Sequence, residues 1–260
     1  MASVALTIAG SDPSGGAGLQ ADLKTFHQLG VYGMSVVTLL TVQNTQAVSA
    51  VQVLEPRFIV AQLDAVLADI PPVAAKTGAL GNAAVIEALA ARAADFGFPL
   101  VVDPVMISKH GDPLLEPDGV SVLRRGLVPR ARLVTPNIPE AAVLAETEIT
   151  DVSDMERAAG RIALLGVPNV LIKGGRLAGA AVDVLWADGE LHRFSAPRID
   201  TPHTHGTGCV YAAAITARIA RGEDLVAAGA KARTFVARAI ATAPQLGGGR
   251  GPVNLHAPAE

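Results

Sequence analysis

The chain of 260 residues contains a single cysteine, and aromatic residues make up only 3% of it. One cysteine cannot form a disulfide within the chain, which fits a protein of a reducing compartment. Lysine is also scarce: the chain contains five lysines, which are scattered along the sequence. The formal net charge is −3. Without a basic patch, the sequence gives no indication of nucleic-acid binding.

Long hydrophobic runs are absent as well. No apolar stretch approaches the roughly 20 residues that span a bilayer, and the first twelve residues lack the positive start of a signal peptide. We therefore expect a cytoplasmic protein that does not enter membranes. Half of the residues are hydrophobic, and no repeat or linker divides the chain. This indicates one domain over residues 1–260.

Short apolar runs alternate with helical patterns along the chain. The spacing predicts helices over 19–29, 56–68, 82–95, 153–165 and 224–241. It predicts strands over 4–9, 35–42, 73–76, 100–103, 132–136 and 169–173. Two more runs, 182–186 and 191–194, flank Asp188-Gly189, the usual composition of a hairpin turn. The fold class is therefore α/β, with a mostly parallel central sheet between two layers of helices.

The stretch Thr201-Pro-His-Thr-His-Gly-Thr-Gly-Cys209 precedes a long run of helix formers. Gly206, Thr207 and Gly208 stand at the predicted helix start, where unpaired backbone N–H groups can bind an anion. We expect the helix N-terminus to lower the pKa of the Cys209 thiol and make it a usable base or nucleophile. The alternative is a glycine-rich turn in which Cys209 is a small buried apolar residue.

Other nucleotide and thiol motifs are poorly matched. Gly16-Ala-Gly18-Leu-Gln-Ala21 fits the dinucleotide fingerprint, but no acidic residue occurs between Asp22 and Glu55, where that motif requires one. The chain contains no Gly-Lys pair, which excludes a Walker A loop. A thiol hydrolase is disfavoured because no histidine with an orienting partner is identifiable by spacing, and His203 and His205 are equally typical of a loop surface.

Polar residues follow the carboxyl ends of several predicted strands, namely Gln43, Asp103, Asn137 with Glu140, and Lys173. Parallel strands end at one edge of a sheet, so these residues should share a rim with the 206–208 helix start. Lys173 follows three apolar residues, which is unusual unless its ammonium group reaches a polar site. A lysine, oxygen ligands for Mg²⁺ and an anion-binding helix start are the parts that phosphoryl transfer needs. Asn137 and Glu140 are equally typical of an ordinary helix cap.

Eight segments carry a resemblance to a known family: Leu6-Thr-Ile-Ala-Gly-Ser-Asp-Pro-Ser-Gly-Gly-Ala-Gly-Leu-Gln-Ala-Asp22, Val42-Gln-Asn-Thr45, Val102-Asp-Pro-Val105, Gly111-Asp-Pro-Leu-Leu115, Thr135-Pro-Asn-Ile-Pro-Glu140, Lys173-Gly-Gly175, Thr204-His-Gly-Thr-Gly-Cys209 and Gly251-Pro-Val253. By these segments the chain closely resembles the bacterial hydroxymethylpyrimidine/phosphomethylpyrimidine kinases of the ribokinase-like superfamily. The resemblance implies a ribokinase-like homodimer that uses ATP and Mg²⁺. Its substrate would be 4-amino-5-hydroxymethyl-2-methylpyrimidine, and then the monophosphate, giving the diphosphate for thiamine synthesis.

The resemblance also implies roles for individual residues. Gln43 would hydrogen-bond the aminopyrimidine, in a pocket lined by Asp22, Ala79 and Val105. Cys209 would accept the hydroxyl proton. The transferring phosphoryl group would lie against Gly206, Thr207 and Gly208, with Lys173 neutralising its oxygens. Mg²⁺ would be organised, partly through water, by Asn137, Glu140 and Asp103.

Two positions depart from the family pattern. Ala79 stands where the family usually has methionine beside the substrate ring, and Arg176 follows Gly175 where histidine is usual. Because Ala79 widens the predicted pocket, a pyridoxal or pyridoxine kinase of the same fold is an alternative. A sensor that binds the pyrimidine without catalysis is a second alternative, although such a protein needs none of the phosphoryl-transfer groups.

Overall fold

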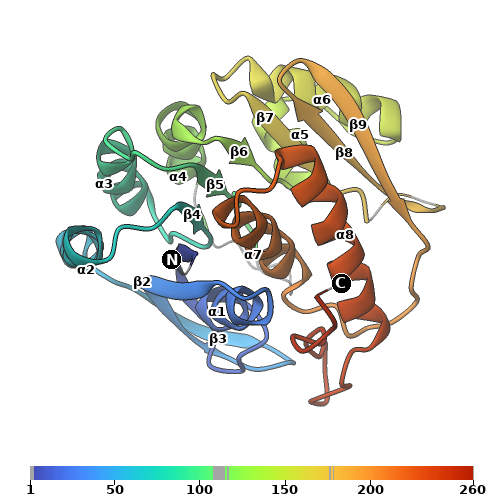
Figure 1. Cartoon of the computed structure of the whole chain (residues 1–260), viewed down its shortest axis with the longest axis horizontal. Coiled ribbons are helices and arrows are strands. Elements are labelled where there is room, and N and C mark those ends of the chain that lie inside the picture. The colour runs from blue at the N-terminus through green and yellow to red at the C-terminus, as the bar shows by residue number, and fades with distance from the viewer. Residues whose placement is uncertain (1–2, 108–114, 116, 176, 178, 260) are drawn as a thin grey trace.

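The computed structural model of the chain describes residues 3–107, 115, 117–175, 177 and 179–259. Residues 111–114 of the segment Gly111-Asp-Pro-Leu-Leu115 and the departure at Arg176 lie outside these described residues. Nine strands form one sheet in the order β3-β2-β1-β4-β5-β6-β7-β8-β9 (Figure 1). The strands are β1 Val4–Ser11, β2 Tyr32–Gln43, β3 Val48–Val53, β4 Ala74–Thr77, β5 Leu100–Val102, β6 Leu133–Val134, β7 Asn169–Ile172, β8 Ala181–Ala187 and β9 Glu190–Ala196.

The prediction of a mostly parallel sheet is confirmed. Strands β2, β1, β4, β5, β6 and β7 are parallel neighbours, while β3 pairs antiparallel with β2 at one edge. At the other edge β8 and β9 form the predicted hairpin, with Asp188 and Gly189 in the left-handed region at φ 47° and 97°. Strand β3 was not predicted, because its side chains are half-buried or exposed and give no buried-strand signal.

Helices cover both faces of the sheet (Figure 1). They are α1 Gly18–Gln28, α2 Pro56–Asp69, α3 Ala83–Ala93, α4 Pro117–Val122, α5 Ile138–Ala145, α6 Val152–Ala163, α7 Thr207–Ala220 and α8 Leu225–Ala241, with a π-helical turn η1 Leu123–Leu127 and a 3₁₀ turn η2 Val128–Arg130. One core joins the sheet to α2, α3, α5 and α6, and the other joins it to α1, α7 and α8. Successive residues of a strand point to opposite faces of the sheet and so join different cores. In β1, Leu6 belongs to the core with α2, α3, α5 and α6, and Ala5 belongs to the core with α1, α7 and α8.

Helix α7 is the most deeply buried of the described helices. Ten of its 14 residues are buried, and it packs against α1, α8 and the sheet. Its many alanines allow this close approach, as expected for a helix that is apolar on all sides. The packing fixes the N-terminus of α7 at the carboxyl edge of the parallel strands. None of the helices in the described residues is both long and apolar enough to cross a bilayer.

Candidate active site

A cavity of about 560 Å³ opens at the carboxyl edge of the parallel strands. Its volume lies within the range of about 300–1,000 Å³ usual for small-molecule sites. The structure brings eleven of the predicted site residues to its lining, namely Gln43, Ala79, Asp103, Val105, Asn137, Glu140, Lys173, Gly206, Thr207, Gly208 and Cys209. The sequence prediction that these strand ends share one rim with the start of α7 is therefore confirmed, while the role of each residue stays a prediction.

Asp22 departs from its predicted place, because it does not line the cavity. Its side chain is fully buried between α1 and the sheet, where Oδ2 accepts hydrogen bonds from Thr7 Oγ1 at 2.6 Å and Lys76 Nζ at 2.7 Å. The reason is the helical register: Asp22 shares the buried face of α1 with Leu19 and Phe26.

The loop between β1 and α1 is folded around Asp12. Its carboxylate accepts hydrogen bonds from the backbone N–H groups of Ser14, Gly16 and Ala17 and from the Ser14 hydroxyl. Burial works to raise the pKa of this carboxyl, but hydrogen bonds from His205 and Ser14 outweigh it and lower the pKa. Asp12 is therefore an ionised organiser of the glycine loop.

The start of α7 rests directly on this loop. Gly206 is the N-cap residue at φ 79°, and a Cβ there would overlap the carbonyl oxygen of Gly16. Only glycine allows both this conformation and this approach of two backbones. No side chain caps the first turn of α7 in the described residues, and the turn contains no acidic residue. Thr207 N already donates to Thr204 O at 3.3 Å, so the N–H groups of Gly208 and Cys209 are the ones available to an anion in the cavity.

Lys173 and two carboxyl groups form a charged cluster on the cavity wall. Lys173 Nζ lies 2.8 Å from Asp103 Oδ1, and Thr135 Oγ1 donates to the same oxygen at 3.3 Å. Burial alone would lower the pKa of Lys173, but the charges of Asp103 and Glu140 outweigh it and raise the pKa. Burial raises the pKa of Glu140 to about 7, against the opposing effect of Lys173. The ammonium group is thus charged at neutral pH and lies near a carboxyl group that burial makes harder to ionise.

Asn137 and Glu140 form a complete capping box at the start of α5. Asn137 Oδ1 accepts from Glu140 N at 3.0 Å, and Glu140 Oε2 accepts from Asn137 N at 2.8 Å. The helix-cap interpretation of this pair is confirmed, and both residues nevertheless line the cavity. The described residues contain no group of three His, Cys, Asp or Glu side chains that could hold a metal. Because these oxygens and Asp103 are already hydrogen-bonded, they fit a Mg²⁺ ion held through water molecules.

The prediction that the helix N-terminus lowers the pKa of Cys209 was wrong. Burial and the negative charge of Asp22 raise the pKa of the thiol to about 11. Lys76 and a hydrogen bond from the Gly18 backbone oppose this shift without cancelling it. At neutral pH Cys209 is therefore a neutral thiol on the cavity wall, and desolvation outweighs the helix terminus.

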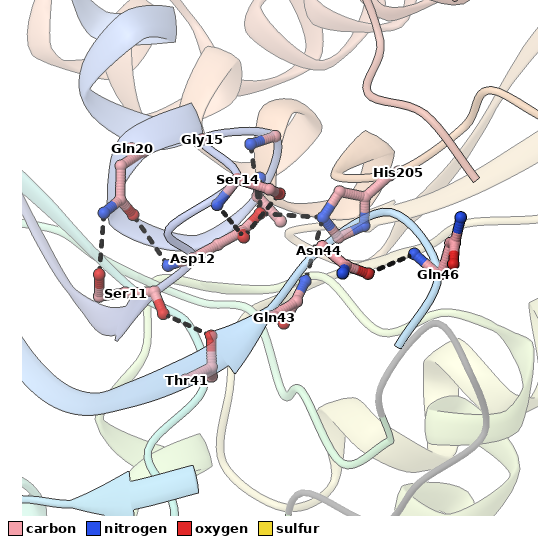
Figure 2. Close-up of polar contacts among 12 residues, drawn as sticks. Ser11, Asp12, Ser14, Gly15, Gln20, Thr41, Gln43, Asn44, Gln46 and His205 are labelled. Atoms are coloured by element: carbon pink, nitrogen blue, oxygen red, sulfur yellow. Dashed lines mark hydrogen bonds and ion pairs between the residues drawn. The ribbon is translucent and has the colours of Figure 1, made fainter. Parts of the chain in front are cut away.

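Sequence reasoning missed several residues of the site. The sequence marks His205 no more strongly than a residue of a loop surface, yet its side chain is buried and its Nε2 lies 2.9 Å from Asp12 Oδ2 (Figure 2). Arg233 and Asp183 also line the cavity and form an ion pair, and the Asp183 carboxylate accepts a hydrogen bond from Gly174 N. An acidic residue inside a glycine loop was the available signal for Asp12, whereas nothing local marks Asp183 or Arg233.

A family model described as phosphomethylpyrimidine kinase matches residues 12–254 of the chain. The chain belongs to the phosphomethylpyrimidine kinase family. Apart from Gly10 and Ser11, the residues that line the cavity lie within the matched region.

Relatives and a solved structure agree with this family. The chain is 50% identical, over 96% of its length, to the thiamine biosynthesis bifunctional protein ThiED of Geobacter sulfurreducens, and it spans about half (51%) of that protein. It is 45% identical to a hydroxymethylpyrimidine/phosphomethylpyrimidine kinase of Synechococcus elongatus, covering 98% of both chains. A Bacillus subtilis pyridoxal kinase solved as an ADP complex matches with a TM-score of 0.91 and 38% identity, covering 99% of this chain and 98% of that one.

Proposed function

We propose that this kinase transfers the terminal phosphoryl group of ATP to the hydroxymethyl group of 4-amino-5-hydroxymethyl-2-methylpyrimidine, and then phosphorylates the monophosphate to the diphosphate used in thiamine biosynthesis. One observation carries the proposal. Lys173, Cys209 and the uncapped start of α7 face the same cavity as Gln43. The anion-binding start of α7, the ammonium group of Lys173 and a thiol that can lie beside the substrate alcohol therefore face one cavity. Phosphoryl transfer requires such groups around the transferring phosphate.

We assign the two substrates to different parts of the cavity lining. The pyrimidine would lie against Gln43, Ala79 and Val105, as the family resemblance implies. The nucleotide would lie against apolar lining residues that include Ile199, Val236 and Ile240. Apolar walls suit a purine ring, and the ADP complex of the related pyridoxal kinase supports nucleotide binding in this fold.

The phosphoryl group is held by backbone and lysine together. N–H groups of the first turn of α7, at Gly208 and Cys209, would point at the phosphoryl oxygens, and Lys173 would neutralise their charge. Asn137, Glu140 and Asp103 would hold Mg²⁺ through water, and the ion would supply further charge neutralisation at the phosphates. Since Lys173 is already paired with Asp103, its ammonium group is oriented before substrate binds.

Cys209 is proposed as the residue that accepts the proton of the attacking hydroxyl. A neutral thiol cannot do this, so the active form is the minority thiolate. The thiol would first lose its proton to water, and the hydrogen bond from Gly18 N–H would stabilise the thiolate. The thiolate would then take the hydroxyl proton as the alcohol oxygen attacks the terminal phosphorus of ATP and ADP leaves.

Pyridoxal phosphorylation is the second candidate. It is favoured by the match to the Bacillus subtilis pyridoxal kinase and by Ala79, whose small side chain leaves space on the cavity wall. The higher identity to kinases named for hydroxymethylpyrimidine favours the first candidate. A non-catalytic sensor is disfavoured, because the chain has Lys173 and Cys209 in the cavity and belongs to a kinase family.

A product assay tests the proposal. The full chain with MgATP is offered hydroxymethylpyrimidine, its monophosphate and pyridoxal separately, and the phosphorylated products are separated and identified. We expect turnover of the pyrimidine and of its monophosphate at a higher kcat/KM than pyridoxal. Exclusive turnover of pyridoxal would replace the proposal by the second candidate, and pyrimidine binding without any product would indicate a sensor.

We also propose that residues 1–260 act as one catalytic domain, in a homodimer located in the cytoplasm. The single continuous sheet supports the first point, since the cavity lining draws residues from strands across the whole sheet. The family resemblance supports the second, and the single cysteine fits a reducing compartment. Light scattering of the purified protein and cell fractionation test the last two points.

A further inference from the structure

Gln43, His205 and Asp12 form a chain of polar contacts at the pyrimidine end of the cavity (Figure 2). His205 Nε2 lies 2.9 Å from Asp12 Oδ2 and 3.1 Å from Gln43 Nε2. The second contact brings two nitrogen atoms together. It is a hydrogen bond only if one nitrogen donates and the other accepts, so the protonation of His205 must be decided before the contact can be interpreted.

Asp12 decides the protonation of Nε2. Its Oδ2 already accepts from Gly16 N and Ala17 N, and its Oδ1 accepts from Ser14 N and Oγ. A carboxylate surrounded by donors is an acceptor, so the atom of His205 that approaches it must carry a hydrogen. The ring cannot easily turn away, because its Cδ2 packs against Gly16, where a Cβ would lie only 2.8 Å from it.

If Nε2 carries a hydrogen, Gln43 cannot present its NH₂ group to it. A carboxamide keeps nearly the same shape when its oxygen and nitrogen exchange places, so its hydrogen-bond partners decide the orientation. We propose that His205, held by Asp12, is a positioning residue that fixes the carboxamide of Gln43 with its oxygen toward the imidazole and its NH₂ group toward the substrate. The His205 N–H is then shared between Asp12 Oδ2 and the Gln43 carbonyl oxygen.

The C-terminal tail holds both ends of this contact in place. His205 N donates to Gly251 O, and Val253 N donates to His205 O. Arg250 N donates to the carbonyl oxygen of Thr45, two residues after Gln43. The segments that contain Gln43 and His205 therefore both form backbone hydrogen bonds with residues 250–253. These bonds fix the distance between His205 and Gln43.

The orientation of the Gln43 carboxamide would determine which substrate rings the enzyme accepts. This consequence rests on the proposed function. An NH₂ group facing the cavity requires an acceptor on the ligand, and the ring nitrogen of a heteroaromatic alcohol supplies one. A ligand with C–H at that position would leave the buried donor without a partner, and such a loss typically costs about tenfold or more in affinity. His205 and Asp12 would thus set which ring atom the enzyme reads without touching the ligand.

The tautomer can be observed directly by ¹⁵N spectroscopy of the full chain labelled in histidine. The His205 signals are assigned from their absence in His205→Gln. We expect Nε2 of His205 to be protonated in the wild-type protein at neutral pH. An unprotonated Nε2 overturns the proposal, whatever the enzyme turns out to phosphorylate.

Kinetics test the link to Gln43. KM and kcat are measured for hydroxymethylpyrimidine and for its two analogues in which one ring nitrogen is replaced by C–H. In the wild type one analogue should raise KM about tenfold relative to the parent, with little change in kcat. His205→Leu should raise KM for the parent and reduce the penalty of that analogue to less than about threefold, because the carboxamide can then turn either end to the ring.

Two variants serve as controls. His205→Gln keeps an N–H donor near the place of Nε2 and should retain the discrimination between the parent and the analogue. His203→Asn lies in the same loop, where His203 Nδ1 accepts from Gly251 N, and should behave as wild type. Undiminished discrimination in His205→Leu overturns the proposal. If the wild type fails to phosphorylate the pyrimidine at all, the proposed function fails, and the ¹⁵N measurement alone decides the orientation.

Discussion

The thiol of Cys209 lies in the first turn of α7, where backbone N–H groups favour the thiolate, while burial and the nearby Asp22 favour the thiol. The outcome is a pKa raised to about 11. Below that value each unit of pH changes the thiolate fraction about tenfold, because the group titrates as a simple acid. The pH dependence of turnover therefore reports whether the thiolate is the base.

We expect kcat/KM of the wild type to rise about tenfold per pH unit between pH 7 and 9. Cys209→Asp supplies a carboxylate that is ionised throughout this range and should give a flat profile. Cys209→Ala should lower turnover at least about a hundredfold while pyrimidine binding persists. Initial rates and equilibrium binding are measured side by side. Unchanged turnover in the alanine variant would remove the base assignment.

Glu140 gives a prediction about stability. Burial raises its folded-state pKa from the ordinary 4.5 to about 7. Between these values the unfolded chain releases a proton that the folded protein retains, so stability falls as pH rises through this window. Glu140→Gln keeps an acceptor for Asn137 N and removes the titration. Its melting temperature relative to the wild type should therefore increase from pH 5 to pH 8, by an amount corresponding to about 2 kcal/mol. A difference in melting temperature that is constant with pH would contradict this.

At the residue scale the sequence predicted the site better than the chemistry within it. Gln43, Lys173 and Cys209 follow apolar runs or a glycine loop, and such a position is visible in the sequence. Whether a side chain is shielded from water enough to shift its pKa depends on packing by distant segments. The sequence therefore does not predict that the Cys209 thiol is protonated at neutral pH. His205 was missed for the same reason, since its partner Asp12 is 193 residues away.

At the scale of elements, the start of α7 and the β1–α1 loop form a single unit. Gly206 has φ 79°, and a Cβ there would overlap Gly16 O, so Gly206→Ala should separate the two backbones. We expect a loss of stability on the order of 1–3 kcal/mol together with loss of activity. Chemical denaturation and initial rates measure the two effects.

Gly208→Ala is the matched control for this prediction. Gly208 does not have a positive φ, and a Cβ there would lie 3.2 Å from Lys173 Nζ, the end of a flexible side chain. This variant should unfold nearly as the wild type does, while its activity falls because Lys173 is displaced. If both alanines destabilised equally, the special conformation of Gly206 would not be what holds α7 on the loop.

The elements themselves were largely predictable. The buried parallel strands and the helices with clear caps were found within a few residues, as with α3, where Asn82 accepts from Val85 N. The missed strand β3 shows the limit, because an edge strand with exposed side chains lacks a burial pattern. The order of strands in the sheet likewise depends on which helix crosses which face, and no local pattern encodes it.

At the scale of the whole molecule, a fully buried ion pair joins helix α1 to the sheet. Lys76 on β4 and Asp22 on α1 are both fully buried and lie 2.7 Å apart. Asp22 Oδ1 has no hydrogen-bond partner among the described residues. The pair lies behind Cys209, whose pKa responds to both charges, so the interior of the fold and the cavity are electrostatically connected.

Removing one partner of this pair should cost far more than removing both. Lys76→Met leaves an uncompensated buried carboxylate, and we expect a loss of about 3–5 kcal/mol in the free energy of unfolding. The double variant Lys76→Met/Asp22→Leu contains no buried charge at this position and should recover most of that loss. Denaturation of the wild type, both single variants and the double variant forms a double-mutant cycle.

If Asp22 lined the substrate pocket, the double variant would bind the pyrimidine weakly despite its recovered stability. Because the carboxylate lies behind the cavity wall, we expect its pyrimidine affinity to remain within about threefold of the wild type.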